Sequence, residues 1–266
     1  MNPVSFEAVT AEAPSRLKLT PGFLAVYFLL RRHWRGVGGV AFGFAALTAL
    51  SGAVLGQDTL VTYVRDVMPQ IGEWRSSWLN ASLPGFWSRL FAPRGVGGEV
   101  LPLVQSPGLS AAMTLVSCLT VVALASHVAT RARSLRQQDW AFALMVVAML
   151  LVAPLTWDHY FVQLLLPAVL CWMTPSPFRG YRTIVVGCLG ALWVGPDWYW
   201  KVLIGTRWLD QVVAQPWQTL TALSFHSYAL VAFFAVTAYA SLTALRDGGL
   251  ADQERLGQTA SEAVRA

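Results

Sequence analysis

Long stretches without a charged residue constrain this chain more than any other feature of its sequence. Seven stretches share that property: Leu19–Leu30, Gly36–Gly56, Pro107–Thr130, Trp140–Trp157, Tyr160–Phe178, Thr183–Pro196 and Pro216–Leu245. A helix needs roughly 20 apolar residues to cross the roughly 30 Å hydrocarbon core of a bilayer. Several of the stretches reach that length, whereas the first would cover only about 18 Å. The pattern predicts an all-α, polytopic membrane protein with about six to seven transmembrane helices.

The composition excludes other classes of protein. Apolar residues make up 55% of the chain and charged residues 12%, whereas a soluble domain is usually about 25% charged. The net charge of +5 is therefore interpreted loop by loop, and no nucleic-acid partner is expected. Cys118, Cys171 and Cys188 lie inside apolar runs without metal-ligand spacing, so we expect neither a disulfide framework nor a metal or other cofactor.

The loops alternate in charge along the chain. Arginines cluster in residues 31–35, 131–136 and 179–182, which we call the basic turns, while the loops over 57–106 and 197–215 carry balanced charge. By the positive-inside rule, the basic turns are cytoplasmic and the balanced loops face the exterior of the plasma membrane.

This topology divides the chain into three parts. They are a polar leader over 1–17, a membrane domain over 18–245 with its external loop at 57–106, and a cytoplasmic polar tail over 246–266. The leader and the tail are expected to be unfolded because they are polar and terminal.

The long external loop contains two segments with distinct patterns. Apolar residues from Leu60 to Ile71 recur at helical spacing, which predicts an amphipathic surface helix interrupted near Pro69. Asn80 and Ser82 follow between Trp78 and Trp87, and Arg89 lies between Trp87 and Leu90. They fit either an interfacial turn whose arginine reaches lipid phosphates or a polar site that recognises a sugar or a phosphate.

A second polar segment follows a helix that the sequence predicts to end at Pro154. Trp157, Asp158, His159 and Tyr160 stand where the chain re-enters the membrane, and ionisable groups there usually face a cavity or a partner. Asp158 can orient His159, and His159 can bind an anion or carry a proton. The alternative is an aromatic belt with a helix cap. His226, inside a span, is interpreted as a hydrogen-bonding residue of the bundle interior.

Three motifs in order resemble glycosyltransferase family 87. Lys18–Pro21, followed by the basic turn Arg31–Arg35, is similar to a mid-chain signature of the family. Asn80–Gly85 with Arg89 resembles its Asn-x-Ser-Leu-x-Gly segment. Ala153–Tyr160 resembles its Ser-Pro-x-Ser-Trp-x-His-His segment, with Ala153, Thr156 and Tyr160 as departures.

The resemblance implies a GT-C-type membrane enzyme that transfers a hexose, specifically mannose, from a polyprenyl-phosphate sugar to a lipid or glycan acceptor. Inverting transfer needs a carboxylate base and donors that stabilise the leaving phosphate. His159 and Asp158 are the catalytic candidates, with Asp158 interpreted as orienting His159. The substrate-binding candidates are Lys18, Asn80, Ser82, Arg89, Trp157 and Tyr160. Neither a metal nor a cofactor is implied.

The resemblance covers the C-terminal half of such an enzyme, from Lys18 onward. The family places its acidic catalytic residue in the first external loop, and no residue before Lys18 is expected to supply it. The sequence thus indicates a truncated, split or degenerate member, with the N-terminal half as a potential separate partner chain. The alternatives are an inactive membrane subunit that retains lipid-phosphate binding, and a small transporter. A transporter would predict repeated halves, and none is found.

Overall fold

The structure is a computed structural model that describes residues 20–93, 100–174, 178–194 and 214–265. No strand occurs in these ranges, and four helical stretches are long and apolar enough to cross a membrane. Three are α3 (Trp34–Leu55), α7 (Pro107–Arg131) and α8 (Leu135–Val152). The fourth, Pro216–Asp247, comprises α12 (Pro216–Leu220), η6 (Ala222–Ser224) and the first part of α13 (Phe225–Arg265). The prediction of an all-α membrane protein is confirmed.

The other three predicted spans form shorter helices, namely α2 (Leu24–Leu30), α9 (Leu165–Met173) and α10 (Tyr181–Trp193). The run predicted at Tyr160–Phe178 begins as a 3-10 helix, η4 (Asp158–Leu164), and continues as α9. Pro167 lies in the first turn of α9, where a proline is tolerated because its missing N–H has no helical partner to lose.

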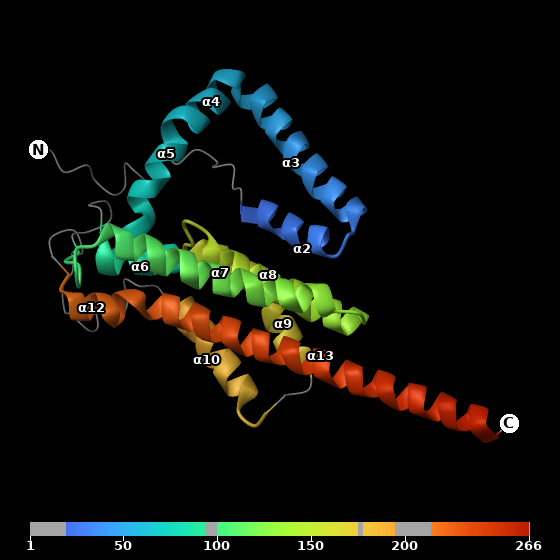
Figure 1. Cartoon of the computed structure of the whole chain (residues 1–266). Helices are drawn as coiled ribbons and strands as arrows, with labels where there is room; N and C mark the ends of the chain where they lie inside the picture. The colour runs from blue at the N-terminus through green and yellow to red at the C-terminus, as the bar shows by residue number, and fades with distance from the viewer. Residues whose placement is uncertain (1–19, 94–99, 175–177, 195–213, 266) are drawn as a thin grey trace, which may run out of the picture.

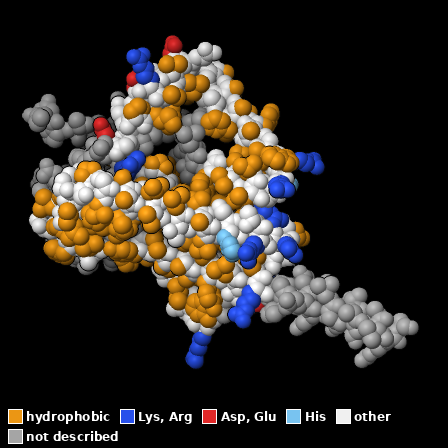
Figure 2. Space-filling view, viewed as in Figure 1, with side chains coloured by type: hydrophobic (Ala, Val, Ile, Leu, Met, Phe, Trp, Pro, Cys, Tyr) orange, Lys and Arg blue, Asp and Glu red, His pale blue; other side chains and the backbone are white. Residues whose placement is uncertain are grey.

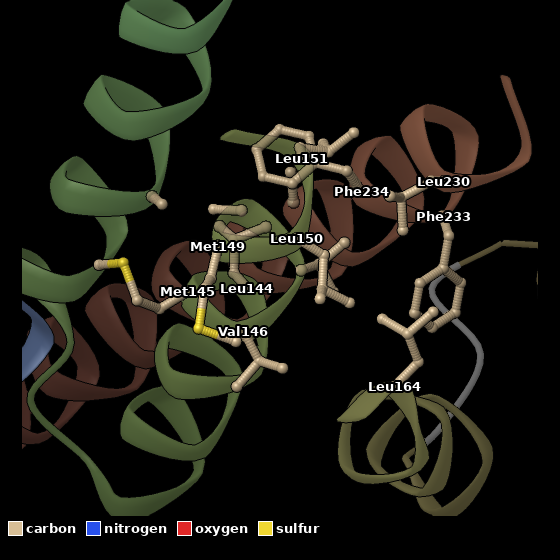
Figure 3. Packing of buried hydrophobic residues seen from close by; sticks show 14 of the residues in the cluster. Leu144, Met145, Val146, Met149, Leu150, Leu151, Leu164, Leu230, Phe233 and Phe234 are labelled. Atoms are coloured by element: carbon tan, nitrogen blue, oxygen red, sulfur yellow. The ribbon is translucent and has the colours of Figure 1, made fainter. Parts of the chain in front are cut away.

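Helix α8 forms the centre of the bundle. It packs against α7, α9 and α13, and most of its side chains from Trp140 to Leu151 are buried. Figure 3 shows Leu151 of α8 beside Phe234 of α13, whereas Phe233 of α13 lies beside Leu164. A helix that is apolar on all sides is typical of such a central position.

Helix α3 stands apart from this bundle (Figure 1), and none of its residues is buried. The chain returns from α3 through four short helical elements, which are α4 (Gln57–Thr62), η2 (Tyr63–Val67), α5 (Met68–Gln70) and η3 (Ile71–Ser76). Helical structure is therefore present where the sequence predicted it. Its winding changes on both sides of Pro69, at η2, a π-helical turn closed by the Met68 N–H on the Tyr63 carbonyl, and at the 3-10 helix η3.

The basic turns gather at one end of the bundle. Arg31 donates to main-chain carbonyls at the end of α7, and Gln137 of α8 donates to the Ala244 carbonyl of α13. Phe178, beside the third basic turn, packs against Tyr239 of α13. Figure 2 shows Arg side chains grouped on that side. Helix α8 has 18 residues and leads over about 27 Å to the opposite end, where the two predicted motifs lie.

The polar tail differs from its prediction. Helix α13 continues through Arg265, whereas the sequence predicted an unfolded segment after Arg246. The tail is rich in Ala, Leu, Gln, Glu and Arg, and these residues have high intrinsic helix propensity.

Candidate functional site

Asn80 joins the two predicted motifs through its side-chain amide. Its Nδ2 donates to the carbonyls of Arg75 at 2.9 Å and Pro154 at 3.0 Å. Its Oδ1 accepts from the N–H groups of Ser82 at 3.1 Å and Thr156 at 2.9 Å. Asn80 is 0% exposed; its bonds with Ser82 and Thr156 are buried, and those with Arg75 and Pro154 are partly buried. We call this set of four hydrogen bonds the Asn80 clamp.

Ser82 and Gly85 build the start of α6 (Leu83–Phe91). The Ser82 hydroxyl accepts from the Gly85 N–H at 3.2 Å, as an N-cap residue does. Gly85 lies in the first turn of this helix. A Cβ at Gly85 would meet the Asn80 amide at 2.5 Å, so glycine is required there for the close approach of Asn80.

Arg89 of α6 is a fully buried cation. Its Nη1 donates to the carbonyls of Ser77 at 2.9 Å and Asn80 at 2.7 Å. Its Nη2 donates to the hydroxyls of Ser227 at 3.1 Å and Ser224 at 3.4 Å. Among the described residues, Nε has no partner and no carboxylate forms an ion pair with the guanidinium. Burial lowers the pKa of Arg89 to about 10, which leaves it protonated at neutral pH.

In the segment from Pro154 to Tyr160, Thr156 is buried and hydrogen-bonded to the protein, whereas later residues are exposed. Pro154 disfavours helix at the preceding residue, and α8 ends at Val152, two residues before the predicted end at Pro154. Thr156 is 0% exposed, and its hydroxyl donates to the Leu150 carbonyl at 2.6 Å. Its main-chain carbonyl accepts from the Ala81 N–H at 2.8 Å. Asp158 and His159, which follow, are both exposed.

No hydrogen bond joins Asp158 to His159 among the described residues. The two residues are consecutive in η4, and consecutive side chains of a 3-10 helix point about 120° apart. The orienting role predicted for Asp158 therefore has no hydrogen bond to support it. Asp158 instead lies at the N-terminus of η4, where a carboxylate is favoured by the unpaired N–H groups.

A row of rings borders the exposed pair. Trp157 packs edge-on against Trp74 of η3 with ring centroids 6.2 Å apart, and His159 lies 5.9 Å from Trp157 and 4.4 Å from Tyr160. Trp74 was absent from the predicted site. The sequence signalled it only by its position shortly before the Asn80 motif, because its contact with Trp157 spans two distant segments.

His226 of α13 lies behind this row. It is buried, its Nε2 is 2.7 Å from the Val194 carbonyl, and its ring packs against Phe161. The charges of Asp158 and Arg89 both act on it. The interpretation of His226 as a hydrogen-bonding residue of the interior is confirmed.

The structure thus sorts the predicted site residues into two groups. Trp157, Asp158, His159 and Tyr160 are exposed or half-buried at one end of the bundle. Asn80, Ser82 and Arg89 are fully buried behind them, with their polar groups directed at the protein, and their direct contact with a ligand stays a prediction. Lys18 lies outside the described residues. The described parts contain no cluster of three or more His, Cys, Asp or Glu side chains that could hold a metal ion.

Fold and site together define a helical membrane protein with a polar, aromatic-bordered site at the end of its bundle opposite the basic turns. The chain belongs to glycosyltransferase family 87, whose sequence profile matches residues 15–155. The resemblance indicated by its motifs is confirmed. No solved structure matches the chain.

Two mycobacterial mannosyltransferases are similar to this chain. One is the polyprenol-phosphate-mannose-dependent alpha-(1-2)-phosphatidylinositol pentamannoside mannosyltransferase of Mycolicibacterium smegmatis, 27% identical over 198 residues, which are 73% of this chain and 42% of the relative. The other is the polyprenol-phosphate-mannose-dependent alpha-(1-2)-phosphatidylinositol mannoside mannosyltransferase of Mycobacterium tuberculosis, 30% identical over 188 residues, 65% of this chain and 34% of the relative. The chain therefore spans less than half the length of these relatives.

Proposed function

We propose that this chain binds polyprenyl-phosphate mannose and takes part in transferring the mannose to a lipid acceptor. The observation that carries the proposal is the exposed pair Asp158 and His159, placed between Trp157 and Tyr160 at one end of a membrane bundle. Membership of family 87 supports a glycosyltransferase, and the names of both relatives support polyprenol-phosphate mannose as donor.

We place this site at the outer face of the plasma membrane. The basic turns lie at the opposite end of the bundle, and arginine-rich loops favour the cytoplasmic side. The same orientation puts the end of α13 in the cytoplasm. The amphipathic run from α4 to η3 exposes Val61, Val64 and Met68, which suits a helix that lies along the membrane surface.

The proposed transfer uses one bond-forming and one bond-breaking event. The acceptor hydroxyl oxygen bonds to the anomeric carbon of mannose, and the bond from that carbon to the phosphate oxygen breaks. The bonding electron pair leaves with the polyprenyl phosphate. The hydroxyl proton passes to a carboxylate, and we assign that role to Asp158 because it is exposed and makes no hydrogen bond to His159. His159 donates to the departing phosphate oxygen.

The remaining predicted residues divide between contact and support. Trp157 and Tyr160 offer ring faces on which a sugar can stack. Asn80, Ser82 and Arg89 support the segment from Pro154 to Tyr160 from the protein interior, and the Arg89 charge adds a fixed positive field. Lys18, which lies outside the described residues, is retained as a second candidate cation for the phosphate.

The test measures binding and transfer separately on the full chain in lipid nanodiscs. Radiolabelled polyprenyl-phosphate mannose reports binding, and a lipid acceptor extract reports transfer. Asp158→Asn should keep donor binding and lower transfer by about 10²–10⁴-fold, the usual contribution of a general base. Asp66→Asn, which changes an exposed carboxylate of η2, serves as the matched control.

Three results would count against the proposal in different ways. Wild-type chain that does not bind the donor would refute it. Donor binding without any transfer would support the alternative of a lipid-phosphate-binding subunit. Transfer that survives in Asp158→Asn would remove the base from Asp158 while leaving the rest intact.

A further inference from the structure

The phosphate of a polyprenyl-phosphate sugar carries a negative charge that the site has to neutralise. Within the described residues at this end of the bundle, the basic side chains are Arg65, Arg75 and Arg89. Arg89 is 0% exposed, and its four terminal N–H donors are directed at protein oxygens. A ligand on the surface therefore needs a different cation for direct contact.

Arg75 lies next to the exposed segment through the Asn80 clamp. The Asn80 Nδ2 donates both to the Arg75 carbonyl and to the Pro154 carbonyl, so these two oxygens are at most about 6 Å apart. The residue before Arg75 is Trp74, whose ring packs against Trp157. Trp74 and Asn80 thus connect the Arg75 backbone to Trp157 and to Pro154.

The Arg75 side chain is exposed. Among the hydrogen bonds and ion pairs of the described residues, none involves its guanidinium. A guanidinium group can donate two parallel hydrogen bonds to two phosphate oxygens in a bidentate geometry. An exposed guanidinium that lacks a hydrogen-bond or ion-pair partner among the described residues, on the residue that follows Trp74, has the chemistry to bind a phosphodiester.

Arg65 provides an internal comparison. It is also exposed, and it lies about three turns earlier in the same helical run. Its element η2 packs against its chain neighbours α4 and α5, whereas η3, which carries Arg75, packs against α6. If exposed arginines here served only to reach lipid headgroups, Arg65 and Arg75 would be equivalent.

We propose that Arg75 contacts the donor phosphate directly, while Arg89 acts on that phosphate only through its charge from the protein interior. This inference rests on the proposed function, because it names the cation of that same site. Asp158, His159 and Arg75 would then surround the bond that breaks, with the carboxylate, the imidazole and the guanidinium in separate roles.

The experiment measures the affinity of the full chain for radiolabelled polyprenyl-phosphate mannose in phosphatidylcholine nanodiscs. Arg75→Gln should weaken binding about ten- to hundredfold, as expected for loss of a hydrogen bond to a charged group. Arg65→Gln should change binding less than about twofold. Both variants should melt at the wild-type temperature because both side chains are exposed. Arg75→Lys keeps the charge but cannot form the bidentate hydrogen bonds, so it should bind polyprenyl-phosphate mannose with intermediate affinity.

A second arm repeats the measurement in discs containing phosphatidylglycerol. If Arg75 bound lipid headgroups instead, wild-type affinity in these discs would fall to the Arg75→Gln level, and the assignment would be overturned. Equal effects of Arg75→Gln and Arg65→Gln would also overturn it, although the proposed function would stand. Failure of the wild-type chain to bind the donor in either disc would refute the proposed function itself.

Discussion

Replacing Asn80 with alanine should destabilise the fold more than any exposed substitution at this end of the bundle. The change removes all four bonds of the Asn80 clamp and leaves the N–H groups of Ser82 and Thr156 buried without an acceptor. A buried donor without a partner costs about 1–3 kcal/mol. The carbonyls of Arg75 and Pro154 lose one donor each, at a smaller cost because a carbonyl tolerates partial satisfaction better. We expect the free energy of unfolding to fall by about 3–5 kcal/mol.

Two measurements check this expectation. Denaturation in mixed detergent gives the free energy of unfolding, and hydrogen–deuterium exchange gives the protection of individual segments. In the wild type, the N–H groups of Ala81 and Thr156 are both bonded and should exchange slowly. In Asn80→Ala, exchange should rise in peptides covering residues 153–160, while α8 below them stays protected.

Gln70→Ala is the matched control, because Gln70 is an exposed amide on the same helical run. It should unfold within about 0.5 kcal/mol of the wild type. If Asn80→Ala behaved like Gln70→Ala and left exchange at Thr156 unchanged, the clamp would contribute nothing measurable, and the reasoning from its four hydrogen bonds would be refuted.

Two further predictions concern residues packed around the clamp. Gly85→Ala should cost about 1–3 kcal/mol of stability by overpacking, because its Cβ would meet the Asn80 amide at 2.5 Å; Gly43→Ala on α3, where nothing lies within 4 Å, should be neutral or stabilising in detergent denaturation. Burial holds the pKa of Arg89 at about 10, below the ordinary 12.5, so the folded and unfolded chains are equally protonated there below about pH 9. As pH rises through about 10, the folded chain releases this proton first, and the wild type should gain stability relative to Arg89→Met; a flat difference from about pH 8 to pH 11.5 would contradict the unpaired burial of Arg89.

The sequence predicted the class of fold well and the partners of its polar residues poorly. Uncharged runs report burial in lipid or protein directly, so the spanning stretches and the end of α8 close to Pro154 were predictable. Partners far along the chain were not. Asn80 bonds Thr156 across 76 residues, and Arg89 bonds Ser227 across 138 residues. A short polar motif looks the same whether its partner is a ligand or a distant segment of the same chain.

This ambiguity explains why the motif residues separate into two groups once the fold is known. A side chain that is 0% exposed and has its hydrogen-bonding capacity used internally, as Asn80 has, can influence a substrate only through the segment it holds. That segment ends in Asp158 and His159, which are exposed. Loss of Asn80 should therefore lower the population of correctly folded sites, whereas loss of Asp158 should lower the rate at each site. A transfer assay normalised to donor-binding sites separates the two, because only the second effect survives normalisation.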